Sequence, residues 1–445
     1  MDAPTDPPPA RVPDGATQAG EVRARWAWAE PAVWTERMLT ALERRGVKGG
    51  RWYSLIDKVY APRTLQAAFA RVKANGGAPG TDHVTIERFE ADLDANFDRL
   101  HRALRDGTYR PQAIRRVWVP KPGRRERRPL GIPTVRDRVV QTALRMALEP
   151  IFERDFAEHS YGFRPKRGAK DALRRVDRLM KAGYAWVVDA DLRRYFDTIP
   201  RDRLMERVRA KVSDGRVLAL LEAYLGQDVL DGAASWTPDA GTPQGAVISP
   251  LLSNIYLDPL DHQMAEQGYE MVRYADDFVL LCRSEAEARE ALAAVAAWVA
   301  EAGLALHPDK TRIVDTAAPG GFDFLGYHFE RGARWPRRRS LAKLKDTIRA
   351  KTRRTNGHSL RAIIASVNRT LRGWYEYFKH SHRFVFDTLD KWVRMRLRSV
   401  LRRRQGRRGR GRGADHQRWP NASFTEHGLF SLAAAHATDR QSARR

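Results

Sequence analysis

The chain has 445 residues, which is enough for two or three domains and a sizeable core. Its 80 Lys and Arg outnumber its 54 Asp and Glu, and the formal charge of +26 indicates a polyanionic partner. A single cysteine, Cys282, excludes an internal disulfide and a zinc site built on cysteines. No run of about 18 apolar residues and no signal-peptide pattern occurs, so we expect a cytoplasmic protein without a membrane span.

The first part of the chain is predicted to be a disordered tail followed by helices. Residues 1–25 are rich in proline and poor in apolar residues, which is typical of disorder. Helical spacing of apolar residues begins near Trp26 and continues to about Phe69, and the Gly/Pro-rich stretch 75–81 predicts a loop. The next expected elements are a basic strand–turn–strand and two helices, at residues 117–133, 136–156 and 169–182.

Two short apolar stretches in the middle of the chain carry carboxylates. The upstream stretch contains Asp189 and Asp191, which share one face because side chains alternate along a strand. Residues 271–282 form two apolar runs split by Asp276 and Asp277, which predicts a β-hairpin with both acids at its tip. An Asp-Asp pair by itself more often marks a surface turn. Its place between apolar half-strands, with an acid-bearing strand upstream, favours a functional site.

Carboxylates in this arrangement suit nucleotidyl transfer. That reaction uses two divalent cations about 3.5–4 Å apart to activate a 3′-hydroxyl and to stabilise the pyrophosphate leaving group. Mg²⁺ prefers oxygen ligands and typically takes one or two carboxylates beside phosphate oxygens and water. A strand-borne Asp opposite a hairpin with two adjacent Asp supplies such a set.

The C-terminal part is basic and helical. Residues 331–413 carry 27 Lys/Arg against 4 Asp/Glu, a balance of +23, which favours nucleic acid over an anionic membrane because the apolar residues follow a helix-core pattern. We expect helices from Ser359 to about His380 and over residues 387–404. The Arg/Gly-rich run 402–413 is expected to be flexible when unbound. The arginines of this run expected to bind nucleic acid are Arg402, Arg403, Arg404, Arg407 and Arg408.

Eight sequence blocks occur in an order that chance would not produce. They are RPLGIPTVRDRVVQ (128–141), SYGFRPKRGAKDAL (160–173), DADLRRYFDTI (189–199), GTPQGAVISPLLSNIYL (241–257), RYADDFVLL (273–281), HPDKTRIV (307–314), FLGY (324–327) and LRGWYEYF (371–378). Together these blocks closely resemble the reverse transcriptase/maturases encoded by bacterial group II introns. The resemblance extends from about Val33 to about His436.

The resemblance implies roles for individual residues. Asp191 matches the first catalytic metal ligand, and Asp276 and Asp277 match the second-motif pair, with Asp189 secondary and Asp197 a turn or cap residue. The expected cofactor is Mg²⁺, as two ions that Mn²⁺ can replace. Residues that match substrate-binding positions are Phe196 against the sugar 2′ position, Gln244 in the incoming-nucleotide pocket, Lys121 and Arg128 on the triphosphate, and Lys310 at the pyrophosphate. The alternatives are a core role for Phe196 and a surface-turn role for Lys310.

The resemblance also implies the fold class, an α+β right-hand polymerase with fingers and palm followed by an α-helical thumb or maturase domain. The expected divisions are a disordered tail (1–25), an N-terminal extension and start of the fingers (26–110), the fingers and palm (111–330), the helical thumb (331–405) and a basic DNA/RNA-binding tail (406–445).

The implied function is RNA-directed DNA synthesis, together with binding of the host intron RNA to assist splicing and mobility. Expected partners are an RNA template, a DNA primer, the intron RNA and a DNA target. Many relatives end in an endonuclease built on Cys pairs with His, and the single cysteine here suggests an endonuclease-less type. The alternatives are a related reverse transcriptase in phage defence or spacer acquisition, and an RNA-binding splicing factor without polymerase activity.

Overall fold

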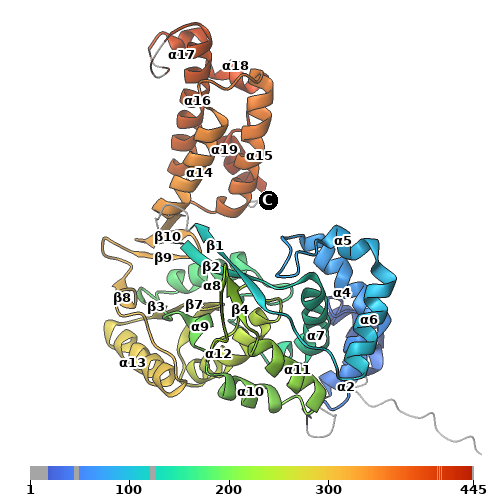
Figure 1. Ribbon diagram of the computed structural model, residues 1–445. Helices are drawn as coiled ribbons and strands as arrows, with labels where there is room; N and C mark the ends of the chain where they lie inside the picture. The colour runs from blue at the N-terminus through green and yellow to red at the C-terminus, as the bar shows by residue number, and fades with distance from the viewer. Residues whose placement is uncertain are drawn as a thin grey trace, which may run out of the picture.

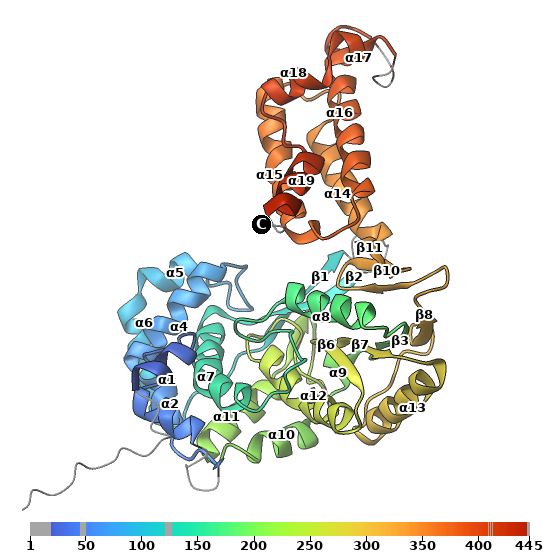
Figure 2. The same cartoon turned by 180° about the vertical axis from the view of Figure 1, so that it is seen from behind.

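The computed structural model describes residues 19–44, 50–120, 127–407, 409, 411 and 413–442. Figure 1 shows a broad lower body, in which helices surround short sheets, and a column of helices above it. The view from behind in Figure 2 shows that the small sheet containing β10 and β11 joins the two parts. Within the described ranges, no helix is long and apolar enough to cross a membrane.

Six helices open the described chain. They are α1 (Ala19–Arg25), α2 (Glu36–Glu43), α3 (Ile56–Tyr60), α4 (Pro62–Asn75), α5 (Ile86–Ala91) and α6 (Leu93–Arg105). Helix α1 corrects the prediction of a disordered tail over residues 1–25, of which residues 1–18 lie outside the described ranges. Val22 is buried in the main core, and the Arg23 guanidinium donates hydrogen bonds to the carbonyls of Ala29 and Trp34. These contacts hold α1 against the body.

The first sheet, here called the fingers sheet, contains the predicted basic hairpin. Strands β1 (Ile114–Pro120) and β2 (Arg127–Ile132) pair antiparallel, as expected. Strand β4 (Val229–Asp231) joins β1 in parallel and β5 (Ala234–Trp236) follows it, giving the order β2-β1-β4-β5. The turn at residues 121–126, and with it Lys121, lies outside the described residues.

Helix α7 (Val135–Glu153) lies inside the lower body, next to the N-terminal helices (Figure 1). Most of its positions are buried on every side, as expected for a helix enclosed by other elements. It packs against α4 and α3 on one side and α12 (Ser249–Glu266) on another. The predicted helices at 136–156 and 169–182 are confirmed as α7 and α8 (Ala169–Lys181).

The second sheet, here called the palm sheet, holds the predicted carboxylates. Its strands are β3 (Trp186–Asp191), β6 (Glu270–Tyr274), β7 (Asp277–Cys282) and β8 (Arg312–Asp315), in the antiparallel order β6-β7-β3-β8. Helices α12 and α13 (Glu285–Glu301) cover one face, and α8 covers part of the other. The predicted hairpin over residues 271–282 is therefore confirmed, with its acids at the tip.

Short elements connect these parts. They are α9 (Tyr195–Thr198), α10 (Arg201–Arg209) and α11 (Gly215–Leu225) below the palm sheet, and a three-stranded antiparallel sheet of β9 (Phe322–Phe324), β10 (Tyr327–Glu330) and β11 (Ala333–Pro336) above it.

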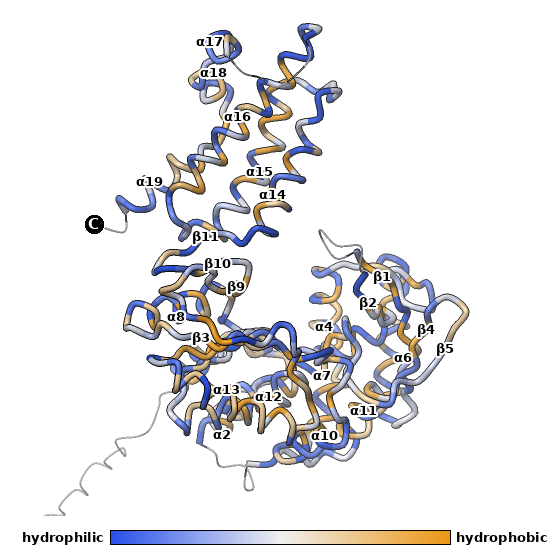
Figure 3. The backbone as a smooth tube through the Cα atoms, turned by 90° about the vertical axis from the view of Figure 1, so that its left-hand side faces the viewer, coloured by the Kyte–Doolittle hydropathy of each residue, from blue (hydrophilic) through white to orange (hydrophobic). Residues whose placement is uncertain are grey.

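The column consists of α14 (Arg338–Lys351), α15 (Leu360–Phe378) and α16 (Phe384–Arg404), followed by α17 (Asp415–Arg418), α18 (Asn421–Glu426) and α19 (Leu432–Ser442). We call residues 338–442 the C-terminal helical unit. Blue and orange turns alternate along its long helices in Figure 3, as expected for helices with one apolar face. Phe424 and Leu432 are buried in the same core as Leu344 and Val393.

The predicted boundary at residue 405 therefore does not separate two structural units. Helices α18 and α19 follow it and complete the core of the C-terminal helical unit, because that core needs their apolar side chains. The run 402–413 is also less free than predicted. Helix α16 continues to Arg404, and Gly411 is buried, with its N–H donated to the Ser399 hydroxyl at 3.2 Å.

Candidate active site

The palm sheet brings two of the three predicted catalytic acids face to face. Asp191, the last residue of β3, pairs directly with Asp277, the first residue of β7. Directly opposed residues of antiparallel strands project from the same face, and thus the two carboxylates share one surface. Asp276 precedes β7 in the hairpin turn, next to Ala275, whose φ is +60°. The register places all three acids at one end of the palm sheet.

The acids perturb one another. Burial and the neighbouring charges of Asp189, Asp276 and Asp191 raise the pKa of Asp277 to about 7. Burial, together with the charge of Asp191, also raises the pKa of Asp276. The Asp277 side chain is nevertheless exposed, and it lines a cavity. Such a surplus of negative charge is stabilised by a bound cation.

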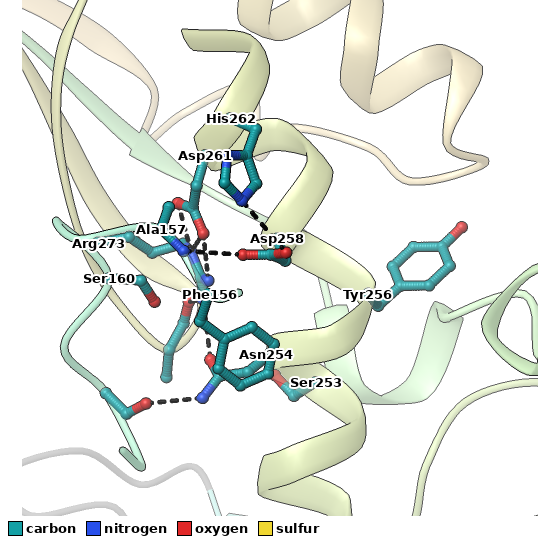
Figure 4. Close-up of polar contacts among 12 residues, drawn as sticks. Phe156, Ala157, Ser160, Ser253, Asn254, Tyr256, Asp258, Asp261, His262 and Arg273 are labelled. Carbon is teal, nitrogen blue, oxygen red and sulfur yellow. Dashed lines mark hydrogen bonds and ion pairs between the residues drawn. The ribbon is translucent and has the colours of Figure 1, made fainter. Parts of the chain in front are cut away.

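The turn that carries Asp276 is held by a buried arginine, Arg273, for which the sequence predicted no role. Arg273 of β6 is 1% exposed and forms an ion pair with Asp261 of α12, with Nε 2.8 Å from Oδ1. Its Nη1 donates to the Ala275 carbonyl at 2.9 Å. The same nitrogen donates to the Asn254 side chain at 3.0 Å (Figure 4). In the sequence, the signal for this role is that Arg273 is a charged residue within the apolar run before Tyr274.

A large cavity opens beside Asp191. Its volume is about 970 Å³, and it lies between the palm sheet and the fingers sheet. Five predicted site residues line it, namely Asp191, Phe196, Gln244, Arg128 and Lys310. Five further cationic side chains line it as well, Arg116, Arg127, Arg193, Arg194 and Arg201. The structure thus brings the predicted nucleotide-binding residues to one cationic cavity, while Lys121 lies outside the described residues.

The backbone of Gln244 is positioned by the close contact of Gly131 in β2 with Gly245 in the next loop. The Gly131 N–H donates to the Gln244 carbonyl at 2.6 Å, which ties the loop 241–248 to β2. Gly245 has a φ of +108°, and a Cβ there would lie 2.2 Å from the Gly131 oxygen. Only glycine fits this contact, which explains the Gly after Gln244.

Phe196 is half-buried in α9. Its ring packs edge-on against Tyr195, with ring centroids 5.3 Å apart, and its carbonyl accepts from the Thr242 N–H at 2.7 Å. The side chain both packs against the core and lines the cavity. The position of Phe196 therefore suits both the predicted substrate role and the predicted packing role.

Lys310 and His307 reach Asp191 from the loop before β8. The Lys310 Nζ lies 2.8 Å from Asp191 Oδ2, and the His307 N–H donates to the Asp191 carbonyl at 2.7 Å. In the described part of the chain, no three His, Cys, Asp or Glu side chains are grouped so as to hold a metal ion. The Asp191 carboxylate forms an ion pair with Lys310. Asp189 is paired with Arg312 at 3.3 Å.

The fingers sheet contributes aromatic residues that the sequence analysis missed. Trp118 is 43% exposed, and its Nε1 donates to Asp231 Oδ2 at 2.9 Å. The Arg116 guanidinium lies 4.4 Å from the Trp236 ring centroid. All three side chains of this Arg/Trp group line the large cavity.

A second cavity, of about 530 Å³, extends from Asp277 to the C-terminal helical unit. Apolar and aromatic side chains such as Leu325 and Trp374 line it, together with Arg337 and Lys343. Asp277 therefore lies at a cavity on the junction of the two parts of the molecule.

The five predicted nucleic-acid-binding arginines are not equivalent. Arg402 bonds to the buried Asp415 at 2.7 Å, and Arg404 donates to the carbonyls of Asn356 and His358. Arg403 and Arg407 are exposed, and their side chains form no ion pair or hydrogen bond with other described residues. Arg408 lies outside the described ranges. Arg402 and Arg404 thus have structural contacts, which the sequence pattern alone could not separate from binding.

The fold and the cavity define a template-directed polymerase, and comparison with known proteins gives its family. Residues 119–329 match the family model for reverse transcriptase (RNA-dependent DNA polymerase), and residues 341–419 match the group II intron maturase-specific domain. The chain belongs to the group II intron reverse transcriptase/maturase family. It is an RNA-directed DNA polymerase that carries a maturase domain.

Several known proteins are similar to this chain. Protein YkfC of Escherichia coli strain K12 is 34% identical over 347 residues, 69% of this chain and 86% of that protein. The group II intron-encoded protein LtrA of Lactococcus lactis is 34% identical over 200 residues, 45% of this chain and 33% of that protein. Among solved structures, a partial Cas6-RT-Cas1–Cas2 complex aligns over 56% of this chain and 41% of its own, at 25% identity and a TM-score of 0.36.

Proposed function

We propose that this protein extends a DNA primer on an RNA template at the cavity beside Asp191. The observation that supports this proposal is the meeting, in one cavity, of Asp191, Phe196, Gln244, Arg128 and Lys310. A cavity of about 970 Å³ is large enough for a nucleotide, and its arginines suit a triphosphate. The deoxynucleotide would be selected by Phe196, which would leave no space for a 2′-hydroxyl.

We propose that Asp191, Asp276 and Asp277, which meet at one end of the palm sheet, hold two Mg²⁺ ions, which Mn²⁺ can replace. In the described residues these side chains are not grouped around a metal position, because Asp191 is paired with Lys310. Their oxygens are the ligands that Mg²⁺ prefers, and the raised pKa values of Asp276 and Asp277 indicate a charge that a cation would stabilise. When bound, the ions activate the 3′-hydroxyl and stabilise the leaving pyrophosphate. Arg128 and Lys310 would bind the triphosphate, and Gln244 would contact the incoming nucleotide.

We further propose that the C-terminal helical unit binds the host intron RNA and assists its splicing and mobility, with a DNA target as the site of insertion. The match of residues 341–419 to the maturase-specific domain supports this role, as does the +23 balance over residues 331–413. Phosphate neutralisation of this kind gives strong, salt-sensitive binding without a sequence code.

Primer extension tests the polymerase proposal. Asp276→Asn should abolish cDNA synthesis on an RNA template with Mg²⁺ or Mn²⁺, because a metal ligand is lost, while affinity for intron RNA stays within about twofold. Asp197→Asn is a matched control, since Asp197 also lines the cavity and, among the described residues, its ion pair is with Arg194 at 3.5 Å. Robust synthesis by Asp276→Asn would refute the assignment, and a wild type that binds RNA without extending primers would favour a splicing factor.

A further inference from the structure

The loop between α7 and α8 exposes an aromatic residue beside the catalytic hairpin. Phe163 is 42% exposed, and its φ of +60° lies in the left-handed region that bulky side chains rarely adopt. Its ring centroid is 6.5 Å from that of Tyr274. Single exposed apolar residues are common, but backbone strain persists only where the surroundings enforce it, and it concentrates at functional positions.

The residues on both sides of Phe163 are clamped. Arg164 is 6% exposed, pairs with Glu153 at 2.9 Å and donates to the Ser160 carbonyl at 2.8 Å. On the other side, a Cβ at Gly162 would lie 2.2 Å from the Ala275 nitrogen, so this backbone is pressed against the catalytic turn. The loop therefore holds Phe163 in its strained, exposed position, and the strain is not a by-product of a flexible loop.

Phe163 lies at one end of a row of side chains that crosses the palm sheet and includes the catalytic acids. Asp191 is opposite Asp277, and Asp277 is opposite Tyr274, so these three side chains project from one face. Phe163 lies next to Tyr274, at the end of the row away from the nucleotide cavity. A nucleic acid whose growing end reached the acids would extend from that cavity across Tyr274 and Phe163.

We propose that Phe163, supported by Tyr274, packs against a nucleotide of the primer–template duplex next to its growing end. A flat aromatic ring suits the π-face of a base or the face of a sugar, and packing of this kind is independent of sequence. The exposed Lys166, in the same loop, supplies a cation for the phosphate backbone. This inference rests on the polymerase function proposed above.

The test is the affinity of the full chain for an RNA–DNA primer–template, measured without deoxynucleotides. Asn tolerates the left-handed conformation and lacks an aromatic face, so Phe163→Asn should raise the Kd about fivefold or more while the Tm stays equal or increases. Phe163→Trp should retain wild-type affinity. Tyr53→Asn is the control, because Tyr53 is an exposed aromatic residue, 47% exposed, away from the catalytic hairpin. Its place is given by the neighbouring Trp52, which forms a β-bridge with Val212 between α10 and α11, below the palm sheet.

Abasic nucleotides placed one by one along the duplex locate the contact. Wild type should lose affinity at one position near the growing end, and Phe163→Asn should show no further loss there. A lowered Tm for Phe163→Asn would make Phe163 a folding residue and overturn the proposal, as would an unchanged Kd. Because binding is read without chemistry, a wild type that binds the duplex but does not extend it counts against the polymerase proposal alone.

Discussion

The ammonium group of Lys310 lies 2.8 Å from Asp191, a carboxylate proposed to bind metal, so one side chain joins the phosphate-binding and metal-binding parts of the site. Lys310→Met should lower the maximal extension rate about 100-fold if Lys310 protonates the pyrophosphate. It should also reduce the half-saturating Mg²⁺ concentration, by roughly two- to fivefold, because the lysine no longer competes for Asp191. Single-turnover extension across a Mg²⁺ series measures both effects. An unchanged maximal rate would show that Lys310 does not protonate the pyrophosphate and would support its alternative role as a surface-turn residue.

Phe196 should control the choice between deoxynucleotides and ribonucleotides. Phe196→Ala should increase ribonucleotide incorporation, because the ring proposed to exclude the 2′-hydroxyl is removed from the cavity lining. The ring is only half-buried, so the loss of stability should be about 1–3 kcal/mol, below that of a fully buried Phe. Competition between the two nucleotide types and thermal unfolding provide the measurements. An unchanged nucleotide ratio with a larger loss of stability would support the packing role.

Arg273 should be needed for the shape of the catalytic turn. Arg273→Met leaves Asp261 buried without its cation, at a cost of about 3–5 kcal/mol, and removes the donor to the Ala275 carbonyl. We expect a lower Tm and a higher half-saturating Mg²⁺ concentration. Arg398→Met is the control, because Arg398 is equally buried but lies in the C-terminal helical unit, where it donates to the Trp419 carbonyl. If both variants changed Mg²⁺ dependence alike, the effect would reflect general destabilisation.

The arginines at the end of α16 should separate into two groups. Arg403→Gln with Arg407→Gln should weaken binding of structured RNA and reduce the salt slope by roughly one to two units, with the Tm unchanged. Arg402→Gln should instead lower stability by about 1–3 kcal/mol, because the buried Asp415 loses a charged partner. Affinity across a salt series and thermal unfolding distinguish the groups. An unchanged salt slope in the double variant would indicate that RNA binds to the faces of α14–α16 and not to these two arginines.

Much of the site follows from local pattern. The hairpin with Asp276 and Asp277 at its tip is determined by two apolar runs and the acids between them. The alternation of side chains along a strand is enough to place Asp189 and Asp191 on one face. The basic C-terminal part is equally visible, because charge is counted directly from residues 331–413.

Other features depend on contacts between distant residues, and only the tertiary structure decided them. The pairing register puts Asp191 opposite Asp277, packing buries Arg273 under the turn, and the loop before Arg164 presents Phe163 beside Tyr274. The apparent boundary at residue 405 disappears because α18 and α19 fold back onto helices that precede it. Composition and periodicity describe each segment by itself. Which segments bury one another depends on the free energy of the whole chain, in which side chains far apart in sequence share one core.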